Sequence, residues 1–210
     1  MSLVKYDTQL HTRHYLDQDD ECWYFMEHLE GGYAASPSNQ KISNLKKSIT
    51  TQGTPQGAYK QKAIEEFADD LKAVNFDKHG DIAIVPAPTS NPRGSQNCDD
   101  RLDKVAKLLT DKYPNLILEH LIDTKVSVTP ANHGGSRNID TIKVNTVWNG
   151  FSSDEIDTII ILDDVITTGA HFKAWKEVIK QNYPNVKYIY GFFWAMHMWN
   201  EPSIEVIPEL

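Results

Sequence analysis

The sequence predicts an α/β protein in which a parallel, twisted sheet is flanked by helices. Residues 158–162 are apolar throughout, as expected of a central strand that is covered on both faces. An amphipathic helix follows, and residues 186–190 then form a returning strand. The apolar stripe of this helix consists of Phe172, Trp175, Val178 and Ile179. A strand, a helix and a strand at this spacing make a βαβ unit, and therefore a parallel sheet.

Four further elements are predicted upstream of this unit. Residues 59–75 place apolar side chains on one helical face. Residues 81–85 form a β-branched run that ends at Pro86, which predicts a short buried strand. A helix around residues 102–109 and a strand at 116–118 follow. A long polar segment then extends to residue 138 and is expected to be a loop.

The chain is expected to divide into an N-terminal hood or appendage, residues 1–58, and an α/β core, residues 59–210. Turn-forming glycines, prolines and serines interrupt the first part, with a short helix predicted over residues 42–49. A length of 210 residues suits one domain with a substantial core and a small attachment.

Composition excludes several classes of function. The net charge of −8 argues against direct nucleic-acid binding. The sequence lacks both an apolar run of about eighteen residues and a signal segment, so a cytoplasmic protein is expected. Cys22 and Cys98 lack CxxC spacing, and His11 and His14 have no acidic or cysteine ligands nearby. No protein-held metal site is therefore expected.

The segment between strand 158–162 and the following helix has the composition of a phosphate-binding turn. Thr167, Thr168 and Gly169 precede a helix that is predicted to begin near His171. Ligands of open α/β sheets bind beyond the carboxyl ends of the strands, where this segment must lie. Backbone N–H groups, hydroxyls and the helix dipole can together hold an anion there.

Two carboxylates, Asp163 and Asp164, begin the same segment. They would repel a phosphate, but they accept hydrogen bonds well from neighbouring hydroxyl groups. A ribose 5-phosphate fits this pattern, with its phosphate in the turn and its ring hydroxyls on the aspartates. The alternative is that the aspartate pair is a solvated turn or helix cap.

Residues 160–170 resemble the motif with which type I phosphoribosyltransferases bind phosphoribosyl pyrophosphate (PRPP). The resemblance implies that Asp163 and Asp164 hold the ribose 2- and 3-hydroxyls and that the turn wraps the 5-phosphate. His171 stands where a small hydroxyl residue is common, and either adds a cation near the phosphate or caps the helix. The implied PRPP-binding residues are Asp163, Asp164, Val165, Ile166, Thr167, Thr168, Gly169, Ala170 and His171.

A second set of residues resembles the ComF-like subgroup of these enzymes. It comprises residues 85–88, Arg93 with Gly94, Asn97, and Arg137 with Asn138, although the N-terminal cysteine finger of that subgroup is missing. The resemblance covers about residues 81–195. In the wider family the loop after the first core strand binds pyrophosphate, which implies that role for Ala87, Pro88, Thr89, Ser90 and Arg93.

The implied activity is a magnesium-dependent transfer of phosphoribose from PRPP to a nitrogen nucleophile, a nucleobase or a related amine. Asp163, Asp164 and Arg137 are the candidate catalytic residues, with Arg137 pairing with pyrophosphate and Lys125 and Lys143 as weaker candidates. Mg²⁺ should be held mainly by ligand oxygens and water. The sequence does not fix the oligomeric state; the resemblance is compatible with a homodimer, because type I relatives are commonly dimers.

Three other functions remain open from the sequence. The chain could be a PRPP- or nucleotide-binding regulatory protein without turnover, or a DNA-uptake accessory protein of the ComF-like type. It could also be a phosphohydrolase with Asp163 as nucleophile, against which the Thr-Thr-Gly turn argues. The aromatic residues of segment 188–199 fit a core, a dimer contact or a surface that stacks a base.

Overall fold

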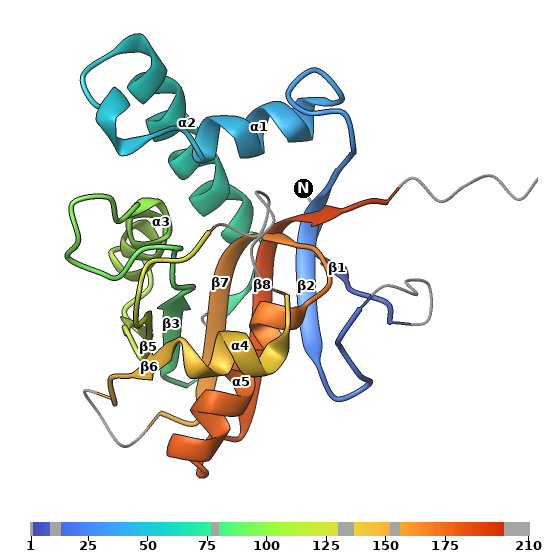
Figure 1. The fold of residues 1–210 in the computed structure, drawn as a ribbon, viewed down its shortest axis with the longest axis vertical. Helices are drawn as coiled ribbons and strands as arrows, with labels where there is room; N and C mark the ends of the chain where they lie inside the picture. The colour runs from blue at the N-terminus through green and yellow to red at the C-terminus, as the bar shows by residue number, and fades with distance from the viewer. Residues whose placement is uncertain (1, 9–13, 77–79, 130–136, 152–155, 200–210) are drawn as a thin grey trace, which may run out of the picture.

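A six-stranded, mainly parallel sheet forms the centre of the computed structural model, which describes residues 2–8, 14–76, 80–129, 137–151 and 156–199 (Figure 1). The strand order is β1-β2-β8-β7-β3-β4, and β1 alone pairs antiparallel within this sheet. The strands are β1 Val4–Lys5, β2 Glu21–His28, β3 Ile82–Pro86, β4 Leu116–Leu118, β7 Thr158–Ile166 and β8 Tyr188–His197. The predicted α/β fold is confirmed.

Helices cover both faces of this sheet. Phe193 and Trp194 are neighbours in β8 and therefore point to opposite faces. Phe193 contacts Phe172 of helix α5, whereas Trp194 stacks on Phe67 of helix α2 with ring centroids 5.1 Å apart. The helices are α1 Pro37–Leu45, α2 Pro55–Leu71, α3 Arg101–Thr110, α4 Ile139–Val144 and α5 Ala170–Asn182, with a short 3-10 helix η1 Ile49–Thr51.

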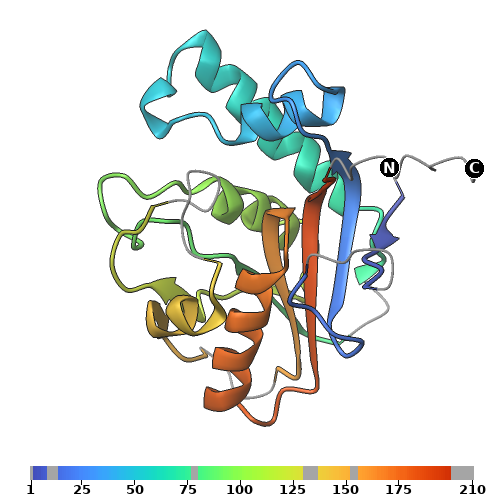
Figure 2. The ribbon, with the colours of Figure 1, turned by 45° about the vertical axis from the view of Figure 1, so that its right-hand side comes forward.

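Two features make the carboxyl ends of the strands the expected position of a ligand site. After β3 the chain crosses to β4 on one side, and after β7 it crosses through α5 to β8 on the other. The loops after β3 and β7 therefore diverge at a topological switch point, where open α/β sheets leave a crevice. Helix α1 and the first half of α2 extend beyond the same ends of the strands (Figure 2).

Most predicted elements are present, but several have different limits, among them α2 (predicted at 59–75) and β8 (predicted at 186–190). Strand β7 does not end at residue 162 but continues to Ile166, because Asp163, Val165 and Ile166 pair with β8. The first helix starts at Pro37 rather than at residue 42, because Ser36 caps it and proline suits a first helical position. The polar segment includes the end of β5 (Ile122–Thr124), which pairs with β6 (Thr146–Trp148); residues 130–136 lie outside the described residues.

The first 58 residues contribute more than the predicted short helix. Strand β2 lies inside the main sheet between β1 and β8, and Cys22, Phe25 and Met26 are buried there. Its apolar run from Cys22 to Met26 is typical of a buried strand, although no strand is predicted there from the sequence. The division of the chain at residue 58 stays a prediction. No helix among the described residues is long and apolar enough to cross a membrane.

Replacing Trp194 by alanine should lower the free energy of unfolding by about 3–5 kcal/mol, because it removes a fully buried indole between the sheet and α2. The substitution also removes the hydrogen bond that Trp194 Nε1 donates to Asp70 Oδ2 over 2.8 Å. Urea unfolding of the two proteins measures the loss. Val144→Ala, at a position that is 77% exposed, is the control and should change stability by less than about 0.5 kcal/mol. A loss below about 1 kcal/mol for Trp194→Ala would contradict this packing.

Candidate functional site

A cavity of about 670 Å³ lies at the carboxyl ends of β3 and β7. Its walls come from segments that are far apart in the sequence. They include Asp163 and Asp164 of β7, residues 88–91 after β3, Thr167 and His171 near the start of α5, and Arg137. The structure thus brings residues of the predicted ribose, phosphate and pyrophosphate segments to one cavity. Of the predicted PRPP-binding residues, Ile166, Thr168, Gly169 and Ala170 are buried and do not line it.

The two aspartates of β7 have different surroundings. Asp164 is buried, with 4% of its surface exposed, whereas Asp163 is partly exposed. Arg101 donates to Asp164 Oδ2 from Nε over 3.1 Å and from Nη2 over 2.6 Å, and Lys46 Nζ lies 3.0 Å from Oδ1. Burial alone would raise the pKa of Asp164, but the charges of Lys46 and Arg101 outweigh it and lower the pKa to about 2.

Asp163 has the opposite shift. Burial, and then the negative charge of Asp164, raise the pKa of Asp163 to about 7. Its Oδ1 accepts the backbone N–H of Asp164 over 2.7 Å. Near neutral pH the cavity therefore contains one fixed carboxylate and one carboxyl group that is poised between its two protonation states.

Arg101 belongs to a chain of ion pairs that connects three helices to β7. Its Nη1 donates to Asp99 over 2.7 Å, and Asp99 accepts from Lys60 of α2 over 2.8 Å at each oxygen. We call the series Lys60, Asp99, Arg101, Asp164 and Lys46 the ion-pair chain. Lys46 is the C-cap of α1 and Arg101 is the first residue of α3. The position of α1 and α2 above the strands is thereby tied to the charge of Asp164.

The predicted phosphate-binding turn is compact and ends in a helix N-terminus. Gly169 is the N-cap of α5 and has a φ of 73°, in the left-handed region that favours glycine. His171 is therefore not the cap. Burial, and then the charge of Arg137, lower the pKa of His171, so this imidazole is neutral at pH 7 and adds no cation near the turn.

The predicted pyrophosphate residues separate into two groups. Pro88, Thr89 and Ser90 line the cavity, while Ala87 is buried and donates its N–H to Leu162 O over 2.8 Å. Arg93 lies outside the cavity lining. Its guanidinium pairs with Asp103 and donates to Pro86 O over 3.1 Å. The cations that line the cavity are Lys46, Arg101 and Arg137.

Arg137 lies in the cavity as predicted, and an unpredicted histidine pair accompanies it. The Arg137 guanidinium carbon is 5.6 Å from the centre of the Trp199 ring, and its Nε has no hydrogen-bond partner among the described residues. His28 and His197, at the ends of β2 and β8, share a hydrogen bond between their Nδ1 atoms at 3.1 Å. Burial is the main cause that lowers the pKa of each imidazole, so the pair is neutral at pH 7.

The remaining basic candidates of the polar segment lie elsewhere. Lys143 pairs with Glu177 of α5 over 2.7 Å, and Lys125 donates its backbone N–H to Asn145 O over 2.8 Å. Neither lysine is part of the cavity lining. No group of three or more His, Cys, Asp or Glu side chains within the described ranges could hold a metal ion, and His11 lies outside them.

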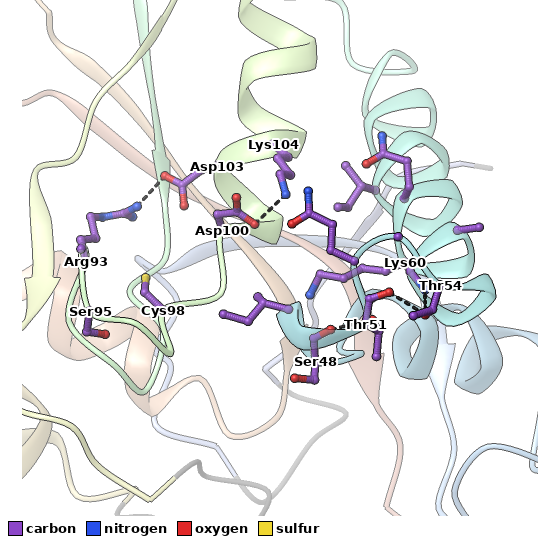
Figure 3. Close-up of a pocket in the computed structure, with 18 residues that line it drawn as sticks. Ser48, Thr51, Thr54, Lys60, Arg93, Ser95, Cys98, Asp100, Asp103 and Lys104 are labelled. Atoms are coloured by element: carbon purple, nitrogen blue, oxygen red, sulfur yellow. Dashed lines mark hydrogen bonds and ion pairs between the residues drawn. The ribbon is translucent and has the colours of Figure 1, made fainter.

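A second cavity, of about 820 Å³, lies between η1, the start of α2 and the 93–104 segment (Figure 3). Its charged groups already pair with one another, Arg93 with Asp103 and Lys104 with Asp100. Lys60 uses its three N–H groups on Asp99 and on Lys47 O. A ligand would therefore have to compete with existing ion pairs here, and the first cavity is the better candidate site.

Comparison with known proteins gives structural similarity without sequence similarity. No protein-family model and no curated protein matches the chain. Two crystal forms of a hypoxanthine phosphoribosyltransferase from Staphylococcus aureus are similar at TM-scores of 0.40 and 0.38, with 11% and 12% identity. Each similarity covers 66% of this chain, and 74% and 75% of that protein. A Trypanosoma cruzi hypoxanthine phosphoribosyl transferase has a TM-score of 0.34 and 11% identity, over 82% of this chain and 85% of that one. Similarity at this level does not show a shared family or activity.

Replacing Asp163 by asparagine should stabilise the protein more at pH 8 than at pH 5. The folded-state pKa of about 7 lies above the ordinary value of 3.8, so the stability that the protonated carboxyl contributes is lost as pH rises through this interval. Asparagine is neutral at every pH, so the Asp163→Asn variant does not lose this stability as pH rises. The melting temperature of Asp163→Asn should exceed that of the wild type by more at pH 8 than at pH 5. We expect the difference between the two gains to be at least about 2 °C, which corresponds to about 1 kcal/mol in a domain of this size.

The control for this comparison is Asp157→Asn. Asp157 is partly exposed, and its hydrogen bond with Lys187 is the largest cause that lowers its pKa, so its removal should not stabilise the protein at pH 8. Equal effects of Asp163→Asn at both pH values would contradict the raised pKa of Asp163.

Replacing Arg101 by methionine should destabilise the protein by about 3–5 kcal/mol, because Asp164 would keep a buried charge with only Lys46 to compensate it. Adding Asp164→Asn should recover a large part of the loss, since it removes that charge. Denaturant unfolding of the two single variants and the double variant measures the coupling. Lys104→Met breaks the exposed pair with Asp100 and should cost less than about 1 kcal/mol. Strictly additive losses would contradict the pairing.

Proposed function

We propose that the protein is a magnesium-dependent phosphoribosyltransferase, which binds PRPP and transfers its phosphoribosyl group to a nitrogen nucleophile with release of pyrophosphate. One observation carries the proposal. The Asp163–Asp164 pair, the turn before α5 and the hydroxyl loop after β3 meet at one cavity, at the switch point of a parallel sheet. The three segments match, in chemistry, a ribose, a 5-phosphate and a pyrophosphate.

The two aspartates are assigned different tasks. Both oxygens of Asp164 already accept from Lys46 or Arg101, so this residue has little capacity left for a ligand. Asp163 is partly exposed and bonds within the chain through one oxygen to the Asp164 N–H. Asp163 is therefore the carboxylate that accepts from the ribose hydroxyls, and Asp164 contributes fixed negative charge beside it.

The reaction breaks the bond between C1 of the ribose and the pyrophosphate oxygen, and forms a bond from C1 to nitrogen. Positive charge develops on the ribose ring as the leaving group departs, and the carboxylates of Asp163 and Asp164 stabilise it. Ser90 donates a hydroxyl hydrogen bond to the pyrophosphate, and Arg137 offers its guanidinium to the negative charge that accumulates there. Thr89 lies beside them, but its hydroxyl donates to Asn91 O over 2.9 Å.

The acceptor is assigned to the end of the cavity at β2 and β8. His197 and Trp199 present rings at right angles, with centroids 4.5 Å apart, and both line the cavity with His28. Such rings stack or edge-pack on a planar heterocycle. The neutral imidazoles can exchange hydrogen bonds with its nitrogen atoms, which suits an acceptor that loses a proton on reaction.

Few protein groups are suited to hold the magnesium ion. The ion pairs of Asp164 with Arg101 and Lys46 leave it with little affinity for a further cation. The cavity offers Asp163 and the hydroxyls of Thr89 and Ser90 as oxygen donors. This set fits an ion that is bound chiefly by pyrophosphate oxygens and water. When bound, Mg²⁺ neutralises charge on the leaving pyrophosphate.

A PRPP-binding protein without turnover is the second candidate. The pairing of Asp164 with Lys46 and Arg101 favours it, because the negative charge that would stabilise the reacting ribose is largely neutralised in the free protein. The two candidates share the binding site and differ in whether PRPP is consumed when an acceptor is present.

Isothermal titration should give a micromolar dissociation constant for PRPP that decreases when Mg²⁺ is added. The variant with both Asp163→Asn and Asp164→Asn should lose this binding, because it lacks the charged acceptor that Asp163 offers to the ribose hydroxyls and the fixed negative charge of Asp164 beside it. Asp100→Asn is the control, since Asp100 is half exposed in the second cavity and pairs with Lys104. Release of pyrophosphate with a panel of nucleobases separates the enzyme from the binding protein. Wild-type protein that binds no PRPP, with or without Mg²⁺, would overturn both.

A further inference from the structure

We propose that residues 14–20, which we call the strap, position the turn that holds the 5-phosphate, so that Tyr15, Leu16 and Asp20 are positioning residues for this site. The proposal rests on the function proposed above. The strap precedes β2 in the chain, about 150 residues before the turn that it contacts.

The strap contacts the turn at two successive residues. The backbone N–H of Tyr15 donates to the carbonyl oxygen of Thr168 over 2.8 Å. Leu16 is buried, with 4% of its surface exposed, and packs against Gly169. A Cβ atom at residue 169 would lie 2.4 Å from Leu16 Cγ. The close approach of Leu16 and the φ of 73° thus require glycine at the same position.

A buried carboxylate fastens the strap to α5. The side chain of Asp20 is fully buried between Lys173 and Lys176, which are one helical turn apart. Asp20 Oδ2 lies 2.8 Å from Lys173 Nζ, and Oδ1 accepts from Lys176 Nζ, which also donates to Asp19 O over 2.7 Å. Oδ2 also accepts the backbone N–H of Asp17 over 3.0 Å.

The cluster of Asp20, Lys173 and Lys176 is better explained by the position that it gives the strap than by a contribution to the stability of the fold. Burying one carboxylate and two ammonium groups costs desolvation, and apolar residues of similar volume are often as stable or more stable. The cluster does fix the first turns of α5 to a segment that continues directly into β2. The strap therefore connects the phosphate turn to α5 on one side and to β2 on the other.

Such bracing matters for a site that binds through its backbone. A turn with a glycine in the left-handed region has many competing conformations when it is free. Binding would have to order it, and that entropy cost would reduce affinity. With Thr168 hydrogen-bonded and Leu16 against Gly169, the N–H groups before α5 are already oriented, and the ordering cost is met during folding.

The test compares ligands that use different parts of the cavity. In Leu16→Ala and Asp20→Asn, the dissociation constant of ribose 5-phosphate should rise at least tenfold, whereas that of magnesium pyrophosphate should change less than twofold. Leu16→Met, which keeps a long apolar side chain, should restore binding to within about threefold of wild type. Leu71→Ala, at a buried leucine of α2, controls for general destabilisation and should preserve affinity for both ligands.

Amide hydrogen exchange at residues 167–170 gives a second readout that needs no ligand. In the free protein, Leu16→Ala should accelerate exchange at these amides at least tenfold, and Leu71→Ala should not. Equal exchange in the two variants, or equal weakening of both ligands by the strap variants, would overturn the positioning role. Wild-type protein that binds neither ligand would instead overturn the proposed function, while the exchange result still decides whether the strap orders the turn.

Discussion

The buried ion pair between Arg101 and Asp164 is the interaction on which the rest of the site depends. A carboxylate at the end of a central strand is unstable there unless a cation compensates it. Arg101 does so from the first residue of α3, and Lys46 does so from the end of α1. The position of the helices above the strands and the charge state of the cavity are therefore set by the same contact.

The pair also makes two adjacent aspartates chemically different. Compensation by Arg101 and Lys46 keeps Asp164 ionised, and that fixed charge then opposes ionisation of Asp163. Separation of two pKa values by environment is how neighbouring carboxyl groups acquire different roles. In this chain, it leaves Asp163 as the group with the capacity to respond to the proposed ligand, while Asp164 is the group that holds the surrounding structure in place.

The sequence was sufficient to predict those features that depend on residues close together in the chain. Continuous apolar runs and a helical stripe predicted β7, α5 and β8, and the segment 163–170 was found because its chemistry is contiguous. Arg101 and His28 were missed because each acts on a partner far along the chain, 63 and 169 residues away. The pyrophosphate role of Arg93 was implied by the family resemblance, but its guanidinium turns to Asp103 and Pro86, which a resemblance in sequence does not reveal.

The site is thus held from two sides by the first sixty residues. The strap braces the turn before α5, Lys46 pairs with Asp164 directly, and Lys60 is connected to Asp164 through Asp99 and Arg101. The contiguous motif supplies the chemistry, but its geometry depends on contacts made by residues that precede it by more than a hundred positions. A chain that began at the core would leave Asp164 with Arg101 alone and Gly169 without Leu16. The motif would still be present, although the charge balance and the braced turn that the proposed binding site requires would be incomplete.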